Sequence, residues 1–175
     1  MTTTRRNILL LSLFLIGSYH AVMAQLGPDV YKYEKKTEDN RMVYQLMVDH
    51  QYAILSIYKA NPPEFVKTLG GFYTIEDDAL EIQLEFNSNF PKDSLMQLDI
   101  PFSKNKNGIK LQLDGKKDFE IMPKVKQDLD GEWLFSARTA DLDKGRREAT
   151  NPRKTLKFLL DGRFQWIAYN TETFE

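Results

Sequence analysis

Histidine and cysteine, the side chains that most often serve as catalytic bases, nucleophiles and zinc ligands, are nearly missing from this chain. The sequence has no cysteine and two histidines, and only His50 lies beyond residue 24. Ser-His-Asp and Cys-His arrangements need a positioned histidine, and structural zinc sites need several histidines or cysteines. His50 falls in a predicted hairpin turn, where exposure is the ordinary outcome. We expect no catalysis of this kind and no zinc site.

Carboxylates are the next candidates, because a pair of them can supply general acid and base. Those placed to do so are Glu64, Glu81, Glu85 and Asp99. Glu81 and Glu85 lie on the outward set of a predicted strand, which favours solvated side chains. The run 76–78 is acidic but lacks the glycine and the spaced oxygen ligands of a calcium loop, so it indicates a hairpin turn. The prediction is a protein that is not an enzyme and has no metal or cofactor.

Basic residues gather in the last third of the chain, where they could bind an acidic glycan or phosphate. They are Arg138, Arg146, Arg147, Arg153, Lys154 and Arg163. Asp141, Asp143 and Glu148 are interleaved with them. This pattern favours a self-neutralised, solvated loop.

Aromatic side chains are the best candidates for a ligand cavity, because small-molecule sites are largely apolar with a few hydroxyls. The residues predicted to point inward and line it are Tyr44, Tyr52, Phe72, Phe86 and Phe102. A packed core with no cavity would use the same residues. The sequence does not choose between the two.

Apolar residues alternate with polar ones over 80–87, the period of a strand with one wet face. Pro101 falls on the outward set of another such segment and marks an edge or a bulge. The predicted strands are 31–36, 42–48, 51–58, 70–75, 79–87, 96–102, 108–113 and 117–122. Eight strands can close into a small barrel. We therefore predict an all-β fold built on an antiparallel barrel, with one short helix at Asn61 to Lys67, where prolines follow an N-cap asparagine.

An internal repeat extends beyond this barrel. The segment 45–55 matches 157–167 at a constant offset, with apolar, aromatic and turn residues in the same order. Asp161-Gly162 is a strong hairpin turn signal. We predict a first β-module at 25–123, a charged linker at 124–128 and an incomplete second module at 129–175. The incomplete copy suggests the hypothesis that the chain is a fragment of a longer two-module protein.

The first 24 residues have the three parts of a secretory signal. Arg5 and Arg6 precede an apolar run over 8–16, and small residues end at Ala24. The run is shorter than the roughly 20 residues of a membrane-spanning helix, so we expect cleavage after Ala24 rather than an uncleaved anchor, leaving no stable membrane span. The remaining chain carries 22 basic and 25 acidic residues, a balance that gives no support to nucleic-acid binding. A bacterial periplasmic or secreted protein is the expectation.

Gly131-Glu132-Trp133 resembles the Gly-X-Trp pattern that opens the first strand of lipocalins. Together with 153–169, it is similar to the lipocalin-like (calycin-type) domains of uncharacterised exported proteins of Gram-negative bacteria. Those domains continue into a Gly-rich strand, which here has a counterpart only in the first module, at 69–74. The first module has no Gly-X-Trp. The residues that carry the structural motif are Gly131, Trp133, Asp161, Gly162 and Trp166.

The resemblance implies an exported, non-catalytic lipocalin-like protein that binds a small amphipathic or hydrophobic ligand in the first barrel. The alternative is an envelope module that binds proteins or glycans, with no internal ligand. Such a module would use strand edges or outward Met47, Leu55 and Ile57. In an incomplete second barrel, Trp133 and Trp166 should pack on the first module, lie exposed or pair between chains. Self-association through the second hairpin is thus a further expectation.

Overall fold

The computed structural model describes residues 26–36, 38, 40–113, 115–137, 145, 146, 148 and 150–175. The predicted signal segment, and Arg138 and Arg147 of the basic cluster, lie outside the described residues.

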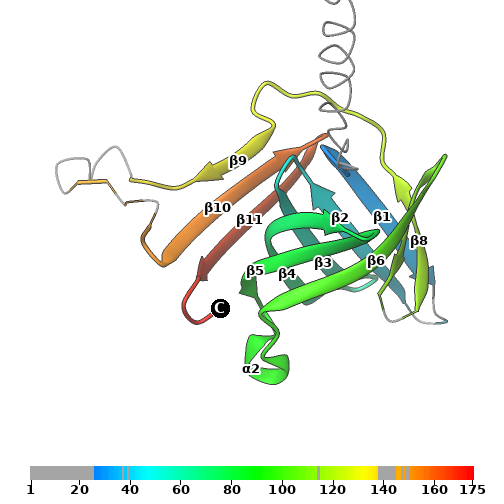
Figure 1. The fold of residues 1–175 in the computed structure, drawn as a ribbon, viewed down its shortest axis with the longest axis horizontal. Coiled ribbons are helices and arrows are strands. Elements are labelled where there is room, and N and C mark those ends of the chain that lie inside the picture. Colours follow the sequence, from blue (N-terminus) through cyan, green and yellow to red (C-terminus); the bar gives the residue numbers. More distant parts are fainter. Residues whose placement is uncertain are drawn as a thin grey trace, which may run out of the picture.

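Eight antiparallel strands form a closed barrel in which each strand pairs with the next along the chain (Figure 1). They are β1 (Asp29–Lys36), β2 (Arg41–Val48), β3 (Tyr52–Ala60), β4 (Pro63–Glu76), β5 (Ala79–Asn87), β6 (Gln97–Asn105), β7 (Gly108–Gln112) and β8 (Lys116–Ile121). Pairing of β1 with β8 closes the ring. The predicted all-β class and the eight-stranded meander are confirmed.

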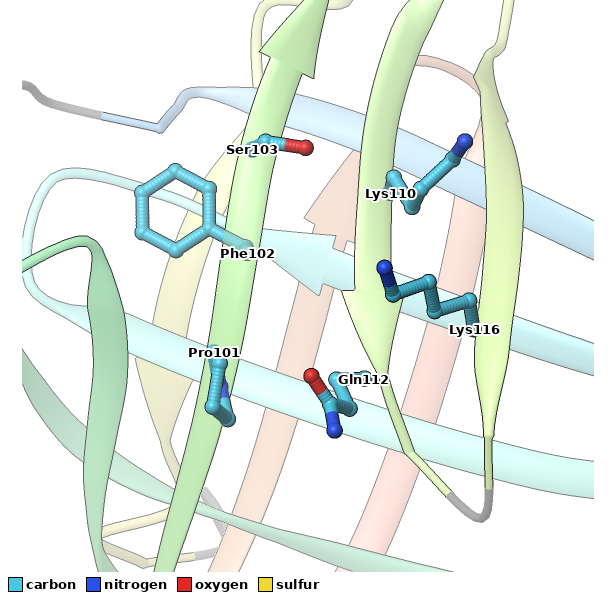
Figure 2. A pocket seen from close by; sticks show the side chains of 6 residues that line it. All are labelled: Pro101, Phe102, Ser103, Lys110, Gln112 and Lys116. Carbon is cyan, nitrogen blue, oxygen red and sulfur yellow. The ribbon is translucent and has the colours of Figure 1, made fainter.

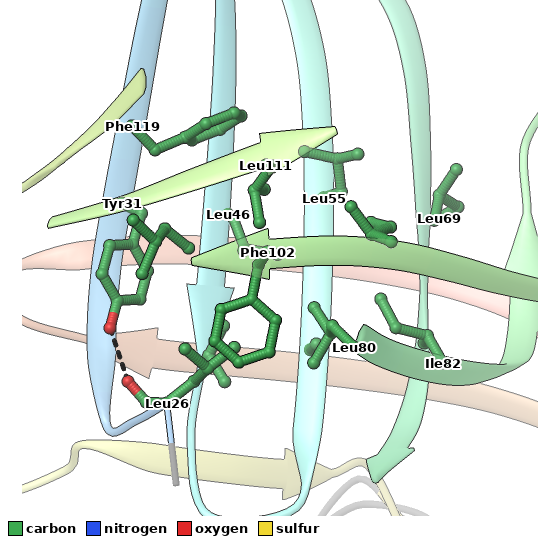
Figure 3. Packing of buried hydrophobic residues seen from close by; sticks show 14 of the residues in the cluster. Leu26, Tyr31, Leu46, Leu55, Leu69, Leu80, Ile82, Phe102, Leu111 and Phe119 are labelled. Atoms are coloured by element: carbon green, nitrogen blue, oxygen red, sulfur yellow. Dashed lines mark hydrogen bonds between the residues drawn. The ribbon is translucent and has the colours of Figure 1, made fainter. Parts of the chain in front are cut away.

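The inward positions of the strands build a packed core (Figure 3). Leu46, Leu80 and Ile100 are fully buried, because alternation along each strand points one side chain in two toward the barrel axis. At one end, the Tyr31 hydroxyl donates a hydrogen bond to the Leu26 carbonyl at 2.6 Å. The middle of the barrel is therefore filled by aliphatic side chains.

A β-bulge interrupts the pairing of β4 with β5. Gly71 pairs with Leu84 and Gly70 with Phe86, so Glu85 is the extra residue. A side chain at Gly71 would place its Cβ 1.9 Å from the Gln83 carbonyl oxygen, which explains the need for glycine. The bulge shifts the alternation of β5, and Phe86 points out of the barrel where an unbroken strand would point it in.

A second sheet has the order β11-β10-β9 and lies beside the barrel (Figure 1). Its strands are β9 (Gly131–Leu134), β10 (Arg153–Leu160) and β11 (Arg163–Asn170). Asp161 and Gly162 join β10 to β11 with φ of 49° and 72°, as a two-residue turn with positive φ requires. In the matching turn of the first copy, the Asp49 carboxylate accepts hydrogen bonds from the backbone N–H groups of Gln51 and Tyr52.

The second sheet covers outward side chains of β1, β2, β3 and β5. One buried cluster joins side chains of the two modules: Val30, Met47, Tyr52, Ile54 and Phe86 from the barrel, and Leu156, Phe158, Leu160, Ile167 and Tyr169 from the sheet. The first hairpin is thus apolar on both faces, and its outer face needs a cover. The second copy of the hairpin supplies it.

The structure corrects several sequence expectations, beginning with the predicted helix. Residues 63–67 are not helical but open β4, where Glu64 pairs with Lys59 and Phe65 with Tyr58. Proline is tolerated as the first residue of a strand, and pairing with β3 overrides the local helix signal. The short helix of the described chain is α2 (Phe90–Asp93).

The second error concerns the surface proposed for an interaction module. Leu55 and Ile57 point into the barrel core, and Met47 lies under the second sheet. Of these three, Leu55 and Met47 are 1% exposed. They therefore offer no interaction surface.

Candidate functional site

The five aromatic residues predicted to line one cavity are divided by the structure. Tyr44 and Phe102 face the barrel core, whereas Tyr52 and Phe86 lie between the barrel and the second sheet. Phe72 is 47% exposed on the outside and meets the Tyr52 ring edge-on, with ring centroids 5.1 Å apart. The hairpin turn and the bulge at Glu85 determine the directions of these side chains. Neither feature can be located from the alternation of apolar and polar residues alone.

The pairing of β1 with β8, which we call the seam, is the shortest strand pairing of the barrel. The two strands pair at two positions, Tyr31 with Ile121 and Lys32 with Glu120. A pocket of about 550 Å³ follows this seam. Its lining residues are Lys32, Tyr33, Glu34, Asp118, Glu120 and Met122.

Behind the seam, Tyr33 leads from the pocket to an aromatic cluster at one end of the barrel. Its ring centroid lies 5.6 Å from that of Tyr44 and 5.7 Å from that of Phe119. Lys117 is 7% exposed, and its ammonium lies 5.4 Å from the Tyr44 ring centroid and donates a hydrogen bond to the Leu113 carbonyl. Tyr33 is therefore the aromatic residue of the pocket lining, and the cluster of Tyr44, Phe119 and Lys117 lies behind it and supports its ring.

The rim of the seam pocket carries paired charges of both signs. Glu34 forms ion pairs with Lys32 and with Arg41, and Lys110 forms one with Asp118 at 3.2 Å. Hydrogen bonding to Lys32 lowers the pKa of Glu34, although burial opposes this. The pocket thus combines four charged residues with the apolar surfaces of Tyr33 and Met122, a lining that suits an amphipathic molecule.

A smaller pocket of about 200 Å³ lies at Pro101, where β6 changes its pairing from β5 to β7. Figure 2 shows Ser103 directed toward Lys110 and Lys116, while Phe102 points to the other side of β6. The pocket thus lies on the polar outer surface, with the Phe102 ring turned toward the barrel core. Its lining lacks the aromatic cluster of the seam.

Two of the candidate carboxylates, Glu64 and Glu85, have different environments. Glu64 is 57% exposed and pairs with Lys59, as a surface residue does. Glu85 does lie on the outward face, but the second sheet covers it. It accepts hydrogen bonds from the Tyr52 and Tyr169 hydroxyls, each at 2.9 Å, and from the Lys154 ammonium at 2.5 Å. These donors hold Glu85 between the two modules.

Glu132, the middle residue of the Gly-X-Trp pattern, is a site residue that sequence reasoning missed. Burial raises its pKa to about 8, and the neighbouring carboxylates of Asp49 and Glu85 add to the effect. Its Oε1 atom is buried with no hydrogen-bond partner. Burial also raises the pKa of Tyr52 well above its usual range, so that its hydroxyl stays a hydrogen-bond donor to Glu85. Glu132, Tyr52 and Glu85 thus form a polar cluster that anchors the second sheet to the barrel.

The other candidate residues lie in turns, on the surface or, for Lys154, against Glu85. His50 is exposed in the turn between β2 and β3, and Asp77 and Asp78 form the β4–β5 turn. Lys154 of the basic cluster is engaged with Glu85, while Arg163 is exposed. Within the described ranges, no cluster of three or more histidine, cysteine or acidic side chains is placed to hold a metal. No described helix has the length and hydropathy to cross a bilayer.

No protein-family model, curated protein or solved structure matches the chain. The fold defines the class instead: a closed, eight-stranded antiparallel β-barrel with an attached three-stranded sheet. This architecture is compatible with a lipocalin-like fold.

Proposed function

We propose that this chain is an exported, non-catalytic, lipocalin-like protein that binds a small amphipathic molecule at the β1–β8 seam. The observation that carries the proposal is the pocket of about 550 Å³ that opens onto Tyr33. Its volume is within the range of small-molecule sites. Export rests on the secretory features of the first 24 residues.

The filled barrel interior favours the seam over the central cavity that the lipocalin resemblance implies. Leu46, Leu80 and Ile82 occupy the barrel axis, and each is fully buried. At the seam, by contrast, Tyr33 is only partly buried. A ligand that binds there would contact Tyr33, and its polar group would meet the charged rim.

A direct binding titration tests this proposal. The purified wild-type protein is titrated with a fluorescent amphipathic probe, anilinonaphthalene sulfonate. The Tyr33→Ala and Phe72→Ala variants are titrated with the same probe in parallel. Phe72 is a matched control, because its ring is half exposed on the outside of the barrel. We expect saturable binding that weakens at least tenfold in Tyr33→Ala and is unchanged in Phe72→Ala.

Circular dichroism of both variants separates loss of the site from loss of the fold. Two outcomes contradict a seam site: non-saturating binding in every variant, and equal weakening by both substitutions. Either would favour surface adsorption of the probe over a defined pocket.

A further inference from the structure

The outer face of the second sheet is aromatic and uncovered. Residues on one side of β10 and β11 pack on the barrel, so the alternate residues point the other way. We call this side the outer aromatic face: Trp133, Lys157, Leu159, Phe164 and Trp166. Trp133, Phe164 and Trp166 are 49%, 55% and 63% exposed.

Strand register places these side chains in rows across the sheet. Trp133 on β9 pairs with Lys157 on β10, which pairs with Trp166 on β11. The Lys157 ammonium lies 5.7 Å from the Trp166 ring centroid. Leu159 and Phe164 form the adjacent row. Neighbouring strands are about 4.8 Å apart, so the side chains form one continuous patch.

The internal repeat shows what such a face binds. Leu159, Phe164 and Trp166 correspond in the repeat to Met47, Tyr52 and Ile54 of the first hairpin. Those three residues are 1% exposed, because the second sheet covers them. The outer face of this hairpin is therefore a surface that accepts another β-sheet, and in the second copy it is uncovered.

We infer that the outer aromatic face pairs with the same face of a second copy of this chain, forming a two-fold symmetric dimer. An isologous contact needs only one self-complementary patch, and this patch is apolar except for Lys157. The Trp133 indole N–H already donates to the Leu129 carbonyl at 2.9 Å, so its ring presents an apolar surface. A glycan would need many polar partners that the patch does not offer.

The size of the patch sets the expected strength. An aromatic side chain covers about 200 Å² when fully buried, so three half-exposed rings with Leu159 give roughly 400 Å² per protomer. The total of about 800 Å² lies below a standard stable interface of about 1,600 Å². Interfaces of this size are typical of weak, transient association, so we expect a dimer that dissociates reversibly on dilution.

Intrinsic fluorescence reports directly on this face, because Trp133 and Trp166 are the only tryptophans of the chain. As the protein concentration rises from below 1 µM to above 100 µM, we expect the emission to shift to shorter wavelength. Sedimentation equilibrium over the same range should show the mass doubling. A double variant, Phe164→Ser with Trp166→Ser, should remain monomeric at every concentration.

Phe65→Ser is the matched control, because Phe65 is 62% exposed on β4 and belongs to no part of the outer aromatic face. It should dimerise like the wild type. The inference is overturned by a monomer at all concentrations, and equally by a dimer that survives the double substitution. A monomer retained on a polysaccharide column through Trp133 and Trp166 would overturn it in favour of glycan binding.

Discussion

Glu85 is the residue whose environment in the structure differs most clearly from the one that the sequence predicts. It lies on the outward set of its strand, which predicts a solvated carboxylate, yet its side chain is 16% exposed and has three donors. Tyr52 comes from the barrel, and Lys154 and Tyr169 come from the second sheet. One carboxylate therefore ties the two modules together.

Replacing Glu85 by alanine should destabilise the protein by about 3 kcal/mol, because the partly buried Lys154 ammonium would lose its counter-charge. Urea unfolding, followed by circular dichroism, measures the change. Glu81→Ala is the control on the same strand and should stay within about 0.5 kcal/mol of the wild type. Equal, small effects of the two substitutions would mean that apolar contacts alone hold the sheet.

Glu132 makes the stability depend on pH. Burial raises its pKa from the ordinary value of 4.5 to about 8 in the folded protein. The folded state thus keeps a proton that the unfolded chain has lost, and stability falls as the pH rises between these values. In Glu132→Gln this decline should be absent.

Thermal midpoints at pH 5, 6.5 and 8 check this expectation. The advantage of Glu132→Gln over the wild type should grow toward pH 8. If the two proteins lose stability in parallel across the range, Glu132 does not titrate as its burial beside Asp49 and Glu85 requires.

At the scale of elements, the alternation of apolar and polar residues predicts every barrel strand. Most of the predicted strand ends lie within a few residues of the observed ones. Leu80, Ile82 and Leu84 face the core as their spacing predicts. The beginning of β4 was missed, because the prolines after Asn61 signal a helix start as well as a strand start. Only the pairing of Glu64 with Lys59, which depends on β3, decides between them.

The candidate site was less predictable than the strands. Tyr33, at its centre, has no motif, and its role comes from the limited pairing of β1 with β8. Phe86 was assigned to the barrel interior because the bulge at Glu85 leaves no clear mark in the sequence. Counting residues along a strand therefore gives the wrong face after any bulge.

Contact of the second sheet with the barrel should be a main source of stability. Phe158 is fully buried in the cluster between them, so Phe158→Ala should cost about 3–5 kcal/mol in urea unfolding. Phe164→Ala, on the opposite face of the same sheet, should cost less than about 0.5 kcal/mol in dilute protein. Similar losses for both would show that the sheet does not dock as described.

At the scale of the whole molecule, the two copies of the repeated hairpin have different structural roles. The first copy, β2 and β3, is part of the barrel wall, and the second copy, β10 and β11, covers that wall from outside. Sequence similarity showed the duplication but not this packing, because both faces of both hairpins are apolar. Trp133 and Trp166 accordingly lie exposed, one of the three outcomes expected for them.

The seam pocket and the outer aromatic face lie on different modules, so their roles can be separated. Tyr33 lies on β1 and Trp166 on β11, and the second sheet points Trp166 away from the barrel. Loss of one function should leave the other intact.

Native mass spectrometry of the protein purified from a bacterial periplasm without denaturation tests the central claim, ligand binding at the seam, most directly. We predict a chain that begins at Gln25 and carries a reproducible additional mass, which Tyr33→Ala loses and Phe72→Ala keeps. The Phe164→Ser, Trp166→Ser double variant should keep that mass while losing the dimer. A wild-type protein with no additional mass, or one whose additional mass survives Tyr33→Ala, would contradict the seam as a ligand site.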